Sequence, residues 1–267
     1  MNPQSNHPSP PRRARSLRQE YEEFVLQRIE EYKEQLSRAD LLSLGDEAVR
    51  ELEAGPEGQL VLTEVLMLDH VDRLITKRLR LPTYRRWRQK HLKLRQAQQG
   101  PTHWGLPSDI PLGQLAHGLG DADMALVIGA RLAPVAFLLA AHDANVLLID
   151  QDLAAVEATE SRAASEALAS RFQALVISLG GWFPDVQPHA VVIDPHLIET
   201  LDEATRSGFM SHLKNLTSPG GRHLVMSLAG SREAPESPDG WVRQYGEWVT
   251  ETSLRTGRGG WVLARRP

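Results

Sequence analysis

The stretch from Met124 to Asp150 constrains the fold more than any other part of this chain. An apolar run over 124–129 is typical of a buried strand, and the apolar segment 135–141 predicts a helix that packs on a sheet. A second apolar run, over 146–149, ends at Asp150. Strand, turn, helix, strand and terminal acid follow one another as in a nucleotide-binding α/β unit. We therefore expect the carboxylate of Asp150 to hold the two ribose hydroxyls of an adenosine-containing ligand.

The turn after the first strand carries a single glycine, Gly129, which Ala130 and Arg131 follow. Loops that cradle a phosphate or adenosyl group usually contain several glycines, because the backbone must approach the ligand closely. Gly129 and Ala130 are candidates to offer backbone groups to such a ligand. The alternative is that Gly129 only permits a tight exit from the strand. For Asp150 the alternative is a solvated acid that caps the following helix.

Composition excludes several classes of protein. With 41% hydrophobic and 24% charged residues, the 267-residue chain has the balance of an ordinary globular protein. The absence of cysteine excludes disulfides, thiolate zinc sites and cysteine nucleophiles. The ten histidines are scattered, so we predict no metal site. The sequence contains no apolar stretch of about 20 residues that would span a bilayer and no apolar signal core, so we expect a cytoplasmic protein.

Three regions follow one another along the chain. Residues 1–16 are polar and rich in proline, which predicts a disordered tail. Residues 17–100 predict an all-helical domain, and residues 101–267 predict a second domain. The net charge is +3 over residues 1–100 and −7 over residues 101–267. Apolar residues recur at helical spacing in the first domain, which places its helices at 17–36, 40–53, 58–80 and 83–98.

The second domain alternates strands and helices. Strands are predicted at 124–129, 145–149, 174–178, 190–193 and 222–227, and helices at 134–142, 152–170 and 199–216. This alternation favours an α/β fold, namely a Rossmann-like, mostly parallel sheet with helices on both faces, preceded by the all-helical portion. The chain is expected to end with a helix or strand over 241–254, a hairpin turn at 256–260 and an edge strand at 260–264.

Over about 105–267 the chain resembles the class I S-adenosylmethionine-dependent methyltransferases. Ala-Leu-Val-Ile-Gly at 125–129 matches the first strand and its glycine, and Leu-Leu-Ile-Asp at 147–150 matches the ribose-binding acid. Ser-Pro-Gly-Gly-Arg-His-Leu-Val at 218–225 matches the turn before the fifth strand. The glycine motif is degenerate, because Arg131 and Ala133 stand where the family has further glycines. The resemblance implies S-adenosyl-L-methionine as cofactor, bound by Gly129, Ala130, Asp150, Ser178 and Gly180.

The resemblance also points to Asp194-Pro195-His196, which follows the fourth strand at 190–193. Asp194 would accept a hydrogen bond from the methyl acceptor and His196 would remove its proton near neutral pH. The alternative is that Asp194 caps the next helix and His196 is merely exposed. Trp182 and Phe183 follow the third strand. In a functional interpretation they stack on adenine or line a substrate cleft, and in the structural alternative they fill the core beneath a loop.

The segment 73–95 contains ten basic residues and no acidic one, which predicts a strongly positive local potential. Nucleic acid is one possible partner, through Arg85, Arg86, Arg88, Lys90, Lys93 and Arg95. The alternative is that these cations face the acidic second domain or water.

Two functional hypotheses follow. The first is a methyltransferase that acts on an unidentified acceptor. The second is a catalytically inactive methyltransferase-like interaction protein that binds nucleic acid through 73–95. The sequence leaves the acceptor and the oligomeric state open.

Overall fold

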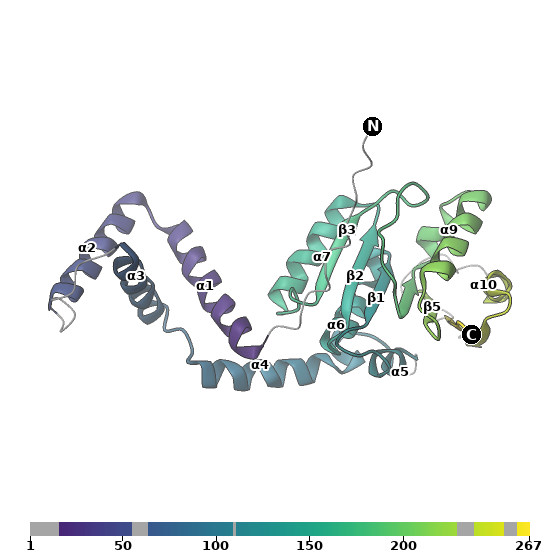
Figure 1. Cartoon of the computed structure of the whole chain (residues 1–267), viewed down its shortest axis with the longest axis horizontal. Helices are drawn as coiled ribbons and strands as arrows, with labels where there is room; N and C mark the ends of the chain where they lie inside the picture. The colour runs from purple at the N-terminus through teal and green to yellow at the C-terminus, as the bar shows by residue number, and fades with distance from the viewer. Residues whose placement is uncertain (1–15, 55–63, 109–110, 229–237, 254–260) are drawn as a thin grey trace. The chain divides into compact units, whose positions relative to one another are not determined.

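The computed structural model describes residues 16–54, 64–108, 111–228, 238–253 and 261–267 (Figure 1). The chain divides into two compact units, of which the first ends at Leu94 and the second begins at Arg95. This boundary falls inside a helix, whereas the sequence placed it at residue 100. The predicted tail, 1–16, lies outside the described residues except for Ser16, and so does the predicted turn at 256–260.

The first unit is helical. Ser16 begins it with a capping box, in which its hydroxyl accepts from the Gln19 N–H at 3.2 Å and its own N–H donates to Gln19 Oε1 at 2.9 Å. The helices are α1 (Leu17–Gln35), α2 (Arg38–Ala54), α3 (Glu64–Arg78) and α4 (Tyr84–Gln98), the last of which continues into the second unit. Its core contains Ile29, Leu44, Ala48, Leu74 and Ile75.

The second unit is built on one seven-stranded sheet. Its strands are β1 (Met124–Ile128), β2 (Asn145–Asp150), β3 (Phe172–Val176), β4 (Ala190–Ile193), β5 (Arg222–Met226), β6 (Val249–Ser253) and β7 (Trp261–Arg265). They lie in the order β3-β2-β1-β4-β5-β7-β6, with the first five parallel and β7 antiparallel to both of its neighbours. The predicted Rossmann-like fold class is confirmed.

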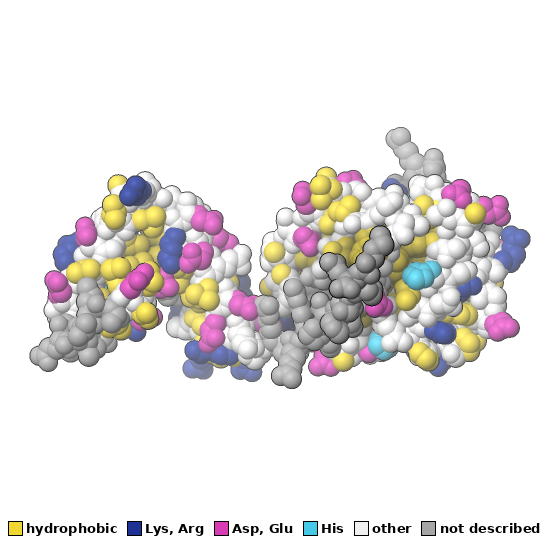
Figure 2. Space-filling model, turned by 45° about the horizontal axis from the view of Figure 1, so that its top comes forward, with side chains coloured by type: hydrophobic (Ala, Val, Ile, Leu, Met, Phe, Trp, Pro, Cys, Tyr) yellow, Lys and Arg dark blue, Asp and Glu magenta, His cyan; other side chains and the backbone are white. Residues whose placement is uncertain are grey.

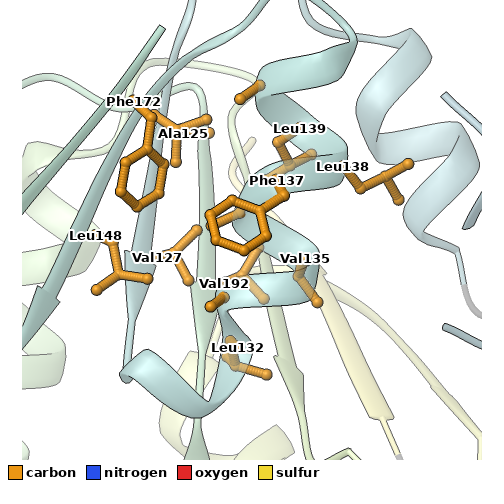
Figure 3. Packing of buried hydrophobic residues seen from close by; sticks show 14 of the residues in the cluster. Ala125, Val127, Leu132, Val135, Phe137, Leu138, Leu139, Leu148, Phe172 and Val192 are labelled. Atoms are coloured by element: carbon orange, nitrogen blue, oxygen red, sulfur yellow. The ribbon is translucent and has the colours of Figure 1, made fainter. Parts of the chain in front are cut away.

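Helices cover both faces of this sheet. On one face lie α5 (Leu112–His117), α6 (Ala133–Ala141) and α7 (Leu153–Ser165), and on the other lie α9 (Glu203–Leu216) and α10 (Pro238–Tyr245). Figure 3 shows Phe137 of α6 directed toward strand residues that include Val127, and its ring centroid lies 5.5 Å from that of Phe172. Since α6 is apolar on every side and eight of its residues are buried, it anchors the turn after β1 firmly.

The connection from β3 to β4, residues 177–189, contains no helix. The other connections between parallel strands each contain at least one helix: α6, α7, or the pair α8 (Pro195–Glu199) and α9. The apolar residues Ile177 and Leu179 of this loop pack instead against the face of the sheet that α9 covers. The loop therefore takes the place of a covering helix next to α9.

Three local predictions were wrong. The third strand ends at Val176 and not at residue 178, so Ser178 lies beyond it. The predicted helix 199–216 begins instead at Glu203, because Asp202 caps its start, and a separate short helix, which Asp194 caps, ends at Glu199. The predicted edge strand 260–264 is internal: β7 inserts between β5 and β6, and β6 forms the edge.

Candidate functional site

Gly129 lies at the end of β1, where the strand order changes direction between β2 and β4. In open α/β sheets this switch point, at the carboxyl ends of the strands, is where ligands bind. Gly129 has φ +107°, and a β-carbon on it would lie 2.7 Å from Cβ of Asp194. The position therefore requires glycine for two reasons, its backbone conformation and the close approach of the residue that follows β4.

The carboxylate of Asp150 is turned toward the backbone of the two adjoining loops. Its Oδ2 accepts from the N–H of Ala130 at 2.6 Å, and its Oδ1 accepts from the N–H of Asp152 at 2.9 Å. The residue is buried, with 8% of its surface exposed. It is not the solvated helix cap of the alternative interpretation, since the cap of α7 is Asp152. A carboxylate has about four acceptor positions, so about two remain for a ligand.

The turn 129–130 satisfies its own backbone groups. The N–H of Gly129 donates to the carbonyl of Ile149 at 2.9 Å, and its carbonyl accepts from Leu132 at 3.0 Å. Ala130 donates to Asp150 and its carbonyl accepts from Ala133. The N–H groups of Gly129 and Ala130 are thus engaged within the chain. Arg131, which replaces a family glycine, is exposed to solvent.

Asp194 directly follows β4, on the other side of Gly129 from Asp150. Its N–H donates to the carbonyl of Ile128 at 2.9 Å, and its Oδ1 accepts from the N–H of His196 at 3.1 Å, which makes it the N-cap of α8. This matches the alternative interpretation of Asp194 as a cap. The residue is 3% exposed.

Burial raises the pKa of the Asp194 carboxyl, and the nearby charge of Asp150 adds to this. The His196 N–H, the His196 ring and the Arg131 guanidinium oppose the rise without cancelling it. A buried carboxyl with a raised pKa is a better proton acceptor than an ordinary one. The carboxyl ends of β2, β1 and β4 therefore bring together two buried carboxyl groups, those of Asp150 and Asp194.

His196 is half-buried rather than exposed. Its Nε2 is buried and has no hydrogen-bond partner among the described residues. Buried polar atoms normally have a partner. The described residues therefore leave the hydrogen-bonding capacity of this nitrogen unused.

Ser178 and Gly180 lie in the loop after β3. The N–H of Ile177 donates to the backbone carbonyl of Asp150 at 2.9 Å, so the next residue, Ser178, lies just beyond the end of β2. Gly180 has φ +89°, and a β-carbon there would lie 2.5 Å from Cγ2 of Thr205 in α9. The structure thus brings Gly129, Ala130, Asp150 and Asp194 together, while Gly180 packs against α9.

Two cavities are lined by described residues. One, of about 120 Å³, lies at the opposite, amino edge of the sheet between Leu115, His189 and Arg222. The other, of about 410 Å³, lies between α9 and the loop 180–183. Neither includes Gly129, Asp150 or Asp194. One sequence interpretation has Trp182 and Phe183 lining a cleft, and both residues line the larger of these two cavities. Sequence reasoning missed its other wall, which α9 supplies.

Of the predicted cationic residues on α4, Arg85, Arg86, Arg88, Lys90 and Lys93 are exposed, and Figure 2 shows Lys and Arg side chains gathered where α4 begins. The sixth, Arg95, is partly buried and bonds Asp143 at 3.4 Å. No group of three or more His, Asp or Glu residues in the described part of the chain would hold a metal ion. None of the helices that these residues form is long and apolar enough to cross a bilayer.

No family model matches this chain, and no curated protein does. Solved structures do match it. One is the glycopeptide N-methyltransferase MtfA with S-adenosyl-L-homocysteine (16% identity, TM-score 0.45, 55% of this chain and 84% of that one). Another is the N-methyltransferase NodS from Bradyrhizobium japonicum (14% identity, TM-score 0.49, 58% and 92%). A third is the mitomycin 7-O-methyltransferase MmcR (15% identity, TM-score 0.44, 59% and 55%).

The fold rests on the strand pairing itself. Five parallel strands, an acid at the tip of the second and a closing antiparallel pair are all present. The second unit of this chain therefore has the methyltransferase-like Rossmann fold that the sequence resemblance predicted.

Proposed function

We propose that this protein is an S-adenosylmethionine-dependent methyltransferase that acts on an unidentified acceptor. The observation that carries the proposal is the placement of Asp150 and Asp194 on either side of Gly129, at the switch point of the sheet. One carboxylate has acceptor positions left for a sugar, and the other has a raised pKa suited to taking a proton.

The residues present fit the cofactor in part. Asp150 would accept hydrogen bonds from the two ribose hydroxyls, and Ser178 would lie on the side of the adenine. Gly180, the other predicted residue of this loop, packs against Thr205 of α9 and is not assigned to the cofactor. Arg131 is exposed, and its guanidinium lies near enough to Asp194 to oppose the rise of that carboxyl's pKa. The turn 129–130 would contribute carbonyl lone pairs rather than N–H donors, because both of its N–H groups are already bonded.

When bound, S-adenosylmethionine would supply an electrophilic methyl group. The chain's own residues would then position the acceptor and receive its proton. Asp194 would orient the nucleophilic atom and accept the proton, helped by burial that makes the carboxyl more basic. The unpartnered Nε2 of His196 would accept a hydrogen bond or the proton itself. Placing the nucleophile in line with the methyl group would provide most of the rate enhancement.

Calorimetry with S-adenosyl-L-homocysteine tests this proposal. We expect saturable binding that weakens by about 10- to 100-fold in Asp150→Asn, because a charged acceptor of hydrogen bonds is removed. Asp152→Asn is the matched control: it changes the same residue type two positions away, at the cap of α7, and should leave the affinity within about twofold. A folded protein that binds nothing at millimolar ligand would instead favour the catalytically inactive interaction protein.

We also propose that α4 contacts nucleic acid. The support is a group of five cationic side chains that are exposed and for which the described residues supply no ion-pair partner: Arg85, Arg86, Arg88, Lys90 and Lys93. A helix rises about 1.5 Å per residue, so these five cations lie within about 12 Å along its axis, a spacing suited to successive phosphates. Salt-dependent retention of RNA tests this role.

A further inference from the structure

The cavity of about 410 Å³ beside α9 exists because the β3–β4 connection is a loop. Its lining comes from two sources: Gly180, Gly181, Trp182 and Phe183 of the loop, and Thr205, Gly208, Phe209 and His212 of α9. The volume falls in the range of sites for small organic molecules. The candidate methyl-transfer residues Asp150 and Asp194 are not among these eight.

The lining has a definite chemistry. It contains no Asp, Glu, Lys or Arg, so His212 is the only one of these eight residues whose side chain can carry a charge. The ring of Phe183 stands edge-on to Phe209 at a centroid distance of 5.7 Å and to His212 at 5.3 Å. Aromatic walls in this arrangement favour another aromatic ring, by stacking or edge contacts. The ligand that suits them is flat and uncharged.

Trp182 is the most unusual residue of this cavity. Its side chain is 62% exposed, so it is not the core plug of the alternative interpretation. A large ring left in water contributes little to folding, because apolar side chains stabilise a fold by being buried. A ligand ring lying against Trp182 would bury that surface.

Gly208 keeps the cavity open at a cost to α9. It lies in the middle of the helix, where glycine is less stable than alanine by up to about 1 kcal/mol. Among the described residues, and apart from the backbone of α9 itself and the two neighbours in the chain, no atom lies within 4 Å of where its β-carbon would be, so packing does not require glycine. Gly180, by contrast, needs its positive φ of +89° and lies against Thr205.

We propose that this cavity binds an uncharged, planar aromatic ring of a small molecule, held between the Trp182 side chain and the Phe183–Phe209–His212 wall. The proposal does not depend on methyl transfer. A bulky side chain at residue 208 would occupy the ring's place, while the fold would keep its own contacts.

Fluorine NMR with 5-fluoroindole tests this site on the whole chain, because the protein contains no fluorine and only the probe gives a signal. We expect a saturable shift with the wild type. Gly208→Leu should weaken binding at least tenfold, and Trp182→Ala should weaken it several-fold. The matched control is Gly113→Leu, since Gly113 of α5 also has no atom within 4 Å of its β-carbon position; it should bind like the wild type. Thermal unfolding of all variants checks their folding.

Two further measurements test whether the cavity selects uncharged rings and whether it is separate from the cofactor site. The anion 5-fluoroindole-2-carboxylate should bind at least tenfold more weakly than 5-fluoroindole, and saturating S-adenosyl-L-homocysteine should not displace the neutral probe. The proposal is overturned if the wild type gives no saturable shift, if Gly208→Leu binds as well as the wild type, or if the anion binds equally. Displacement by S-adenosyl-L-homocysteine, or a wild-type dimer that Gly208→Leu dissociates, would also overturn it.

Discussion

Gly129 and Asp194 are packed so closely that a β-carbon on residue 129 would lie 2.7 Å from Cβ of Asp194. Their backbones belong to the ends of neighbouring parallel strands, and the N–H of Asp194 bonds the carbonyl just before Gly129. This contact holds the buried Asp194 carboxyl beside Asp150. The absence of one side chain therefore sets the spacing of two candidate functional groups.

Gly129→Ala should destabilise the protein by about 2–4 kcal/mol, because it combines an unfavourable positive φ with an overpacked contact. Urea unfolding followed by circular dichroism measures the change. Gly113→Ala is the control, since its β-carbon would meet open space inside a helix, and it should be neutral or slightly stabilising. Equal stability of Gly129→Ala and the wild type would show that the β1–β4 contact relaxes easily.

Asp194→Asn should stabilise the protein at neutral pH. Since burial raises the pKa of Asp194 in the folded state, the folded chain binds more protons than the unfolded one above pH ~4. The charged carboxyl is therefore destabilising at pH 7, whereas asparagine still caps α8. The gain should shrink toward pH 4, where the carboxyl takes up its proton.

Asp202→Asn provides the opposite case. The hydroxyl and N–H of Thr205 lower the pKa of Asp202, so its charged form stabilises the cap of α9. This variant should lose stability at neutral pH, and the loss should disappear as the pH falls below the ordinary range of a carboxyl. Unfolding curves at several pH values compare the two variants, and changes of the same sign would refute the argument.

His223 should make the fold sensitive to acid. It is buried between Thr217 Oγ1, at 2.7 Å from Nε2, and the Tyr245 hydroxyl, at 3.2 Å from Nδ1. Burial lowers its pKa to about 3. Between pH 6.5 and 3 the His223 side chain is protonated in the unfolded chain but stays neutral in the folded chain. The free energy of unfolding therefore falls by up to about 1.4 kcal/mol per pH unit as acid is added.

His223→Gln should be less stable at pH 7, because it disturbs a buried hydrogen-bond network, but should lose less stability as the pH falls. His117→Gln, which changes an exposed histidine, should follow the wild-type slope. Urea midpoints from pH 4 to 8 give these slopes, and parallel slopes for the wild type and His223→Gln would contradict the prediction.

Replacing Arg85, Arg86, Arg88, Lys90 and Lys93 by glutamine should abolish most salt-dependent binding to RNA. For a single strand, removing one cation that binds a phosphate reduces the dependence of log affinity on log salt by about 0.7. Fluorescence anisotropy with a labelled oligonucleotide at two salt concentrations measures this. The control replaces Arg73 and Lys77, whose charges lie near Asp69 and Glu51; equal weakening in that variant would mean that net charge, not the α4 face, drives binding.

The order of strands and helices from Met124 to Met226 was predictable, because strands buried on both faces of a parallel sheet are continuously apolar. The position of Asp150 followed from the same reasoning: an acid directly after such a strand must emerge at the sheet's carboxyl edge. The sequence also predicted that Gly129 forms the turn after the first strand. These features depend on local patterns that the chain carries in its own sequence.

Tertiary structure decided the rest. Whether Asp150 turns toward the Ala130 N–H, whether β7 inserts beside β5, and whether the loop 177–189 leaves a cavity against Gly208 all depend on partners far away in the chain. Hydrogen bonds and packing between distant segments produce no periodic pattern of apolar residues in either segment, so they cannot be predicted from the sequence of one segment. Residue spacing therefore determined which elements form, and the close packing of those elements determined which side chains meet.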